Sequence, residues 1–185
     1  QAAKAAINDL APATMELAQF ELEGMNFVRH YIMNDGTYAG SNFGSTASGY
    51  KEHVYDPDHE MILINFPREG KEPVMLVNWG AHPANPYDAS IGYYNLSSDH
   101  PGWCRDQLEK LTGAKVAYFN GASGNQTPRS NLKHEQHGLR FFEFGAKLAQ
   151  YAMELMPELK DIQGELGGTG NVLEELASKF GVSTQ

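Results

Sequence analysis

Residues 74–119 decide the fold of this chain, because they begin with the apolar run VMLVNW (74–79) and end with the apolar run VAYF (116–119). Short apolar runs of this kind are typical of strands that are buried on both faces. Between them, residues 99–111 are expected to form a helix whose first turn Asp99 caps. A strand, a crossover helix and a second strand form a βαβ unit, so we expect the two strands to be parallel.

Other elements extend this unit in both directions. MILINF (61–66) predicts a third buried strand, joined to the strand at 74–79 by a charged turn at 68–71. A long helix is expected near 135–155, with Pro157 ending it. The central helix should end at Gly113. Its apolar stripe would consist of Trp103, Cys104, Leu108 and Leu111.

The N-terminal third gives weaker signals. Residues 2–12 favour a helix that stops at Pro12, and residues 15–23 and 26–33 are candidate strands joined at Gly24 as a hairpin. Residues 34–57 are rich in Gly, Ser, Thr and Asn, which predicts a long loop.

The predicted fold class is α/β, a layered mixed sheet with a parallel βαβ core flanked by helices. We assign residues 1–157 to one domain and residues 158–185 to a Gly-rich link and a C-terminal amphipathic helix. Asn171 and Glu174 resemble a capping box at the start of that helix. Its apolar residues repeat at i, i+3, i+4 and i+7, and they are Leu173, Leu176, Ala177 and Phe180.

Composition excludes several classes of protein. The 185 residues are 41% hydrophobic and carry a formal net charge of −9, which argues against a nucleic-acid partner. No apolar run approaches the roughly 18 residues of a transmembrane helix, and no signal peptide is visible, so exported and cytoplasmic locations both stay open. A single cysteine, Cys104, excludes an internal disulfide and a cysteine-rich zinc site.

Two polar segments follow the two strands of the βαβ unit: GAHP (80–83) and NGASGNQTP (120–128). Ligands bind beyond the carboxyl ends of parallel strands, so these segments form the candidate site. His82 is either a zinc ligand or a histidine that is hydrogen-bonded at a turn. The pair His134 and His137 is either a second metal pair or a solvated helix start. His53, His59 and His100 offer less individually.

Thr127 and Ser123 are the candidate nucleophiles, because a hydroxyl can attack a carbonyl when a base or a metal activates it. The alternative is a turn in which these hydroxyls satisfy nearby backbone groups. Asp99 is a helix cap, a carboxylate that orients His82, or both.

The order of these segments resembles the amino-terminal catalytic domain of the neutral/alkaline non-lysosomal ceramidases, in its bacterial branch. The similar segments are NFVRHYIMNDGTYAGSNFG, YDPDHEMILINF, VNWGAHPAN, NLSSDHPGW and GAKVAYFNGASGNQTP, and the resemblance covers residues 1–157. It implies zinc-dependent hydrolysis of an N-acyl lipid amide, with His82 at the second zinc histidine and Thr127 at the nucleophilic serine. Gly124, Asn125, Gln126 and Pro128 align around it, with Asn125 in place of an aspartate.

The resemblance also implies that the other zinc ligands lie outside the matched segments, so the chain resembles an internal portion of the domain. In a complete site, backbone N–H groups of Gly121, Ser123, Gly124 and Asn125 would stabilise the oxyanion. Two alternatives remain: a non-catalytic fragment or binding domain without a complete metal site, and a metal-free hydrolase that uses Ser123 or Thr127 with His82 as base. The substrate could also be a related ester, and the oligomeric state is open.

Overall fold

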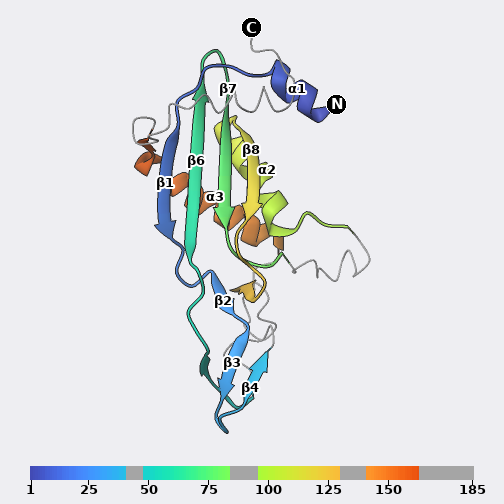
Figure 1. The fold of residues 1–185 in the computed structure, drawn as a ribbon, viewed down its shortest axis with the longest axis vertical. Helices are drawn as coiled ribbons and strands as arrows, with labels where there is room; N and C mark the ends of the chain where they lie inside the picture. The colour runs from blue at the N-terminus through green and yellow to red at the C-terminus, as the bar shows by residue number, and fades with distance from the viewer. Residues whose placement is uncertain (41–47, 84–95, 130–140, 163–185) are drawn as a thin grey trace, which may run out of the picture.

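A computed structural model gives the fold and describes residues 1–40, 48–83, 96–129 and 141–162 (Figure 1). Five strands form the main sheet, in the spatial order β10-β1-β6-β7-β8. Their bounds are β1 Glu16–Glu21, β6 Glu60–Arg68, β7 Lys71–Trp79, β8 Lys115–Asn120 and β10 Lys160–Asp161. The remaining described elements of this part are α1 Ala2–Asn8, α2 Asp99–Thr112, α3 Phe141–Leu155 and a 3-10 turn at Met156–Glu158.

The βαβ prediction is confirmed. β7 and β8 are parallel, with Val74 opposite Lys115 and Trp79 opposite Asn120. Helix α2 connects them and ends at Gly113, whose φ of 70° is the left-handed conformation that glycine adopts without strain. β6 and β7, which contain the two strands predicted on either side of the charged turn, pair antiparallel. The sheet is therefore mixed, as the fold class requires.

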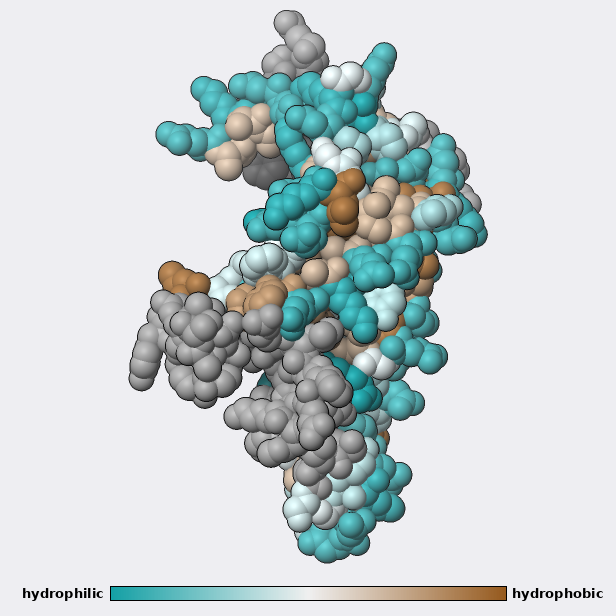
Figure 2. Space-filling view, turned by 180° about the vertical axis from the view of Figure 1, so that it is seen from behind, coloured by the Kyte–Doolittle hydropathy of each residue, from teal (hydrophilic) through white to brown (hydrophobic). Residues whose placement is uncertain are grey.

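Helices α2 and α3 cover one face of the sheet, behind it in Figure 1. They approach closely at Gly145, where a Cβ atom would lie 2.6 Å from the carbonyl oxygen of His100. The predicted apolar stripe of α2 is only half right. Cys104 and Leu108 are fully buried, whereas Trp103 is 37% and Leu111 59% exposed, because they lie away from the sheet. The outer side of this helical layer has hydrophilic areas with hydrophobic ones between them (Figure 2).

Two smaller sheets lie beyond the lower end of the main sheet in Figure 1. β2 (Asn26–Val28) pairs with β9 (Gln126–Pro128), and β3 (His30–Met33) pairs with β4 (Tyr38–Gly40) and β5 (Tyr50–His53).

These pairings correct two predictions. The hairpin at Gly24 is wrong, because β1 pairs with β6 and β10, whereas β2 pairs with β9. The long loop at 34–57 is also wrong in part, since it contributes β4 and β5. The fully buried ring of Tyr31 explains this difference, because it packs against Tyr50 and His53 and gives β5 an apolar contact.

Some predictions fall outside the described residues. They are the start of the long helix before Phe141, the pair His134 and His137, and the C-terminal helix within 163–185. The N-terminal helix is confirmed but ends at Asn8, earlier than Pro12. Among the helices of the described part, none has the length and apolar character needed to cross a membrane.

Candidate functional site

The two polar segments leave the same edge of the main sheet, as predicted. The N–H of Gly121 donates to the carbonyl oxygen of Trp79 over 3.0 Å, directly past the parallel strands. A Cβ atom on Gly121 would lie 3.1 Å from the Cα atom of Gly80. Glycine at both positions therefore lets the two backbones approach each other.

His82 and Thr127 lie close together along the backbone of this edge. The N–H of His82 donates to the carbonyl oxygen of Gln126 over 2.9 Å, one residue before Thr127. The side chain of His82 is exposed, whereas Thr127 is fully buried within β9, opposite Phe27. An extended conformation at Thr127 is expected before Pro128.

A buried polar network holds this arrangement, and the sequence analysis missed it. The side-chain amide nitrogen of Asn26 lies 2.9 Å from the carbonyl oxygen of Gly80, 3.0 Å from Oε1 of Gln126 and 2.7 Å from the carbonyl oxygen of Asp58. Asn26 and Gln126 are only 1% and 5% exposed. Because its amide nitrogen donates, Oδ1 of Asn26 accepts from Nδ1 of His59 at 2.8 Å.

Gln126 extends the network into the 121–125 loop. Its Oε1 also accepts from the N–H of Asp58, and its Nε2 donates to the carbonyl oxygen of Ala122 over 2.7 Å. No local pattern marks Asn26 or Gln126, because their partners lie up to 100 residues away along the chain. Only knowledge of the β2–β9 pairing would have identified them.

The 121–125 loop exposes backbone groups at this edge. Arg29 holds its far end, donating from its backbone N–H to Asn125 O and from its guanidinium to Gly124 O. The N–H of Gly121 is already used by Trp79. Ser123 is half-buried, and its Oγ accepts from the side chain of Asn120 at 2.6 Å. Of the four predicted oxyanion donors, Ser123, Gly124 and Asn125 therefore remain as candidates.

Asp99 lies in the first turn of α2, but Ser98 occupies the N-cap position. The carboxylate of Asp99 accepts from the backbone N–H of His100 at 2.6 Å and lies 3.2 Å from Nδ1 of the same residue. Its φ of 50° is uncommon for a residue other than glycine. His100 is fully buried among Trp79, Phe144 and Tyr118. Orientation of His82 by Asp99 stays a prediction.

The other described histidines have structural contacts. His53 packs on Tyr31 and Tyr50, and its Nδ1 lies 2.6 Å from the carbonyl oxygen of Val28. Partial burial lowers the pKa of His53, more than its contact with Val28 raises it. His59 belongs to the network of Asn26.

The side chains of the described residues do not form a zinc site by themselves. Among the described residues, no three His, Cys, Asp or Glu side chains lie close enough together to hold a metal ion. About three protein ligands are usual for catalytic zinc. His82 could therefore supply one ligand of a shared site, and the described part of the chain does not complete it.

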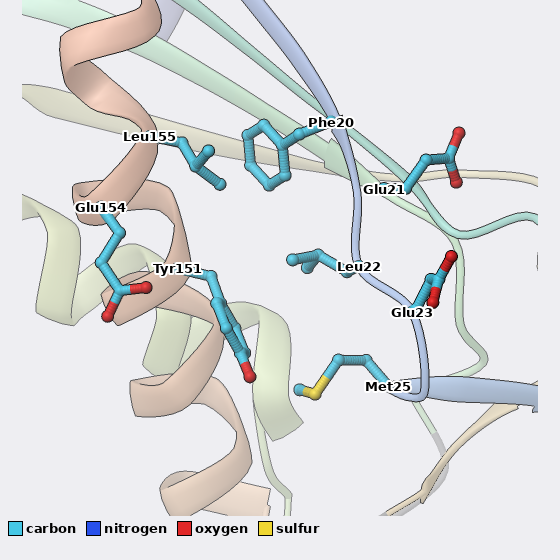
Figure 3. Close-up of a pocket in the computed structure, with 8 residues that line it drawn as sticks. All are labelled: Phe20, Glu21, Leu22, Glu23, Met25, Tyr151, Glu154 and Leu155. Carbon is cyan, nitrogen blue, oxygen red and sulfur yellow. The ribbon is translucent and has the colours of Figure 1, made fainter.

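A pocket of about 420 Å³ lies elsewhere, between the end of β1 and α3 (Figure 3). Phe20, Leu22 and Met25 point from one side toward Tyr151 and Leu155 on the other. None of the predicted site residues lines this pocket, so it is separate from the edge that carries His82.

Comparison with solved structures finds proteins that share this fold. A neutral ceramidase from Pseudomonas aeruginosa superimposes with a TM-score of 0.57 at 19% identity, over 82% of this chain and 24% of that one. The fold is that of part of a neutral ceramidase. A structure described as a ceramidase complexed with C2 matches similarly, with a TM-score of 0.56 at 17% identity, over 82% of this chain and 23% of that chain.

The chain thus spans about a quarter of the length of these ceramidases. No protein-family model and no curated protein sequence matches it. The shared fold agrees with the resemblance seen in the sequence.

Proposed function

We propose that this chain is part of a ceramidase-like hydrolase and that it carries one zinc ligand, His82, and the 120–128 segment with the candidate nucleophile. The proposed substrate is an N-acyl lipid amide or a related ester. The observation that carries the proposal is the hydrogen bond from the N–H of His82 to Gln126 O. It joins the segment of the candidate ligand to the segment of the candidate nucleophile, in the fold of an enzyme that is named for cleaving ceramide.

Each group at the edge has a role in this proposal. The hydroxyl of Thr127 attacks the carbonyl carbon of the substrate, and the N–H groups of Ser123, Gly124 and Asn125 stabilise the oxyanion that forms. The bond to the leaving amine or alcohol then breaks, the leaving group takes the proton of the hydroxyl, and water hydrolyses the resulting ester of Thr127 to release the acid. Because Thr127 is fully buried and Ser123 is half-buried, Ser123 is the more accessible hydroxyl and the alternative nucleophile. Asp99 would orient His82.

A zinc ion that His82 helps to hold would polarise the carbonyl group of the substrate and lower the pKa of the attacking hydroxyl. The described donors do not complete its site. We therefore assign to this chain one ligand, His82, and expect the others to come from outside the described residues.

Hydrolysis of a fluorescent ceramide analogue, with and without added zinc, tests the proposal. We expect Thr127→Ala to abolish turnover while circular dichroism shows that the chain is still folded, and Thr127→Ser to retain turnover. Asn78→Ala, a change at the same edge that removes only the hydrogen bond to Phe119 O, is the control and should leave turnover unchanged. Full turnover by Thr127→Ala together with loss in Ser123→Ala would reassign the nucleophile, and full turnover by both variants would exclude a hydroxyl nucleophile.

The lack of a complete group of metal ligands among the described residues supports a second candidate, a scaffold or binding domain without catalysis of its own. With one described ligand, His82 should bind zinc weakly or not at all. Calorimetric titration of the chain with zinc measures this directly. Sub-micromolar affinity that His82→Ala abolishes would contradict this candidate and would show a complete site.

A further inference from the structure

The second face of the main sheet is apolar, and no described helix covers it. Side chains alternate along each strand, and those of Leu63 and Val77 are fully buried against α2 and α3. The alternate positions therefore point to the opposite face, the one nearer the viewer in Figure 1. We name this surface the open face. Its apolar residues are Leu17, Ile62, Ile64, Phe66, Val74, Leu76, Ala117 and Phe119.

One row of these residues is apolar across four strands, and the rows beside it also contain Gln19, Asn78 and Lys115. Leu17 lies opposite Ile64, Ile64 opposite Leu76, and Leu76 opposite Ala117, so one apolar row crosses four strands. Phe119 is 54% exposed, and the other seven residues of the open face are half-buried. A contiguous apolar patch on a soluble domain marks a surface that another element covers.

Helix α1 does not cover the open face. All of its residues are exposed, and Figure 1 shows it beyond the upper end of the sheet. Asp9, directly after it, forms ion pairs with Arg68, Lys71 and Lys115 at that end. These ion pairs therefore hold α1 at the upper edge of the open face.

The described part of the chain ends beside this surface. β10 pairs with β1, and the N–H of Ile162 donates to the carbonyl oxygen of Met15 over 3.0 Å. The following link, QGELGGTG at residues 163–170, has eight residues and can span about 26 Å. Three strand spacings from β10 to β7 amount to only about 14 Å. A fully extended segment of eight residues is therefore long enough to reach the middle of the open face.

We propose that the amphipathic segment 171–180 docks as a helix on the open face. Residues 163–185 lie outside the described structure, so the argument for this occupant is its sequence pattern, its length and its point of attachment. Its stripe of Leu173, Leu176, Ala177 and Phe180 needs an apolar partner. A ten-residue helix is about 15 Å long, which matches the width of the apolar row from β1 to β8.

Methyl NMR of the full chain tests this docking. Leu176→Asp places a charge in the apolar stripe, and Ser178→Asp places the same charge on the opposite side of the predicted helix. We expect the first variant to shift the methyl resonances of Ile62 and Ile64 and to increase binding of a hydrophobic dye. The second variant should do neither. Equal responses of the two variants, including none, would overturn the proposal.

Disulfide trapping gives an independent measurement if Leu176→Asp fails to fold. The pair Leu76→Cys and Leu176→Cys should oxidise within one chain, whereas Leu76→Cys with Ser178→Cys should not. Native Cys104 does not interfere, because it is fully buried. A disulfide between two chains would assign the open face to a second copy and refute the docking, as would the absence of any disulfide in both pairs.

Discussion

Replacing Asn26 by alanine tests whether the buried network holds the candidate site together. The side-chain nitrogen of Asn26 lies within 3.0 Å of three oxygen atoms, and its Oδ1 accepts a further hydrogen bond from His59. The residue is 1% exposed, so water does not replace these partners without opening the structure. Asn26→Ala should therefore lower the free energy of unfolding strongly.

The magnitude follows from the partners that lose a hydrogen bond. Asp58 is exposed and its carbonyl group can be hydrated, while Oε1 of Gln126 keeps the N–H of Asp58. The carbonyl oxygen of the buried Gly80 loses its Asn26 donor. One buried group left without a partner costs about 1–3 kcal/mol, and with the weaker losses the total is about 2–4 kcal/mol.

Urea unfolding at 25 °C, followed by circular dichroism, measures this loss. Asn78→Ala is the matched control, because its side chain donates to the carbonyl oxygen of Phe119 at the same edge but in an exposed position. It should cost about 0.5–1 kcal/mol. If Asn26→Ala costs no more than Asn78→Ala, the network does not hold the edge and the reasoning fails.

Three further outcomes follow from single contacts. Gly145→Ala should lower the free energy of unfolding by about 1–3 kcal/mol, because its methyl group would meet His100 O at 2.6 Å. Gly124→Ala, whose methyl group would have no atom within 4 Å, should change it by no more than about 0.5 kcal/mol in the same urea assay. Cys104 should react with a thiol reagent only after unfolding, since burial raises its pKa to about 12; rapid modification of the native chain would contradict this. The pKa of His53 is lower in the folded chain than in the unfolded chain, where it is about 6.5. The free energy of unfolding should therefore rise with pH up to about 6.5 and stay level above it. His53→Phe should reduce this rise, and an unchanged pH profile in the variant would refute the prediction.

The central part of the fold could be predicted because its signals are local. The apolar runs in β7 and β8 and the helix that ends at Gly113 each depend on neighbours in sequence, and a right-handed crossover then leaves few topologies. The hairpin at Gly24 failed for the opposite reason. Gly24 does adopt a φ of 76°, but a turn residue does not specify which strands pair beyond it.

Part of the candidate site could be predicted from the sequence, and part of it could not. The shared edge of His82 and the 121–125 loop followed from the parallel strands. The burial of Thr127 did not, because it results from β9 pairing with β2, about a hundred residues away. Sequence patterns report the period of each element, and they carry no record of such distant partners.

The pairing of β2 with β9 also has a consequence for the order of folding. Closing a loop of about one hundred residues costs more entropy than closing the β6–β7 hairpin, which turns within two residues, Glu69 and Gly70. Long-range pairs of this kind gain their stability only after local structure has formed. The three-residue β2–β9 ladder should therefore assemble after the main sheet and open before it. Amide hydrogens around Thr127 would then exchange faster than those in the centre of β6, and the candidate site would be the part of this fold most easily rearranged without global unfolding.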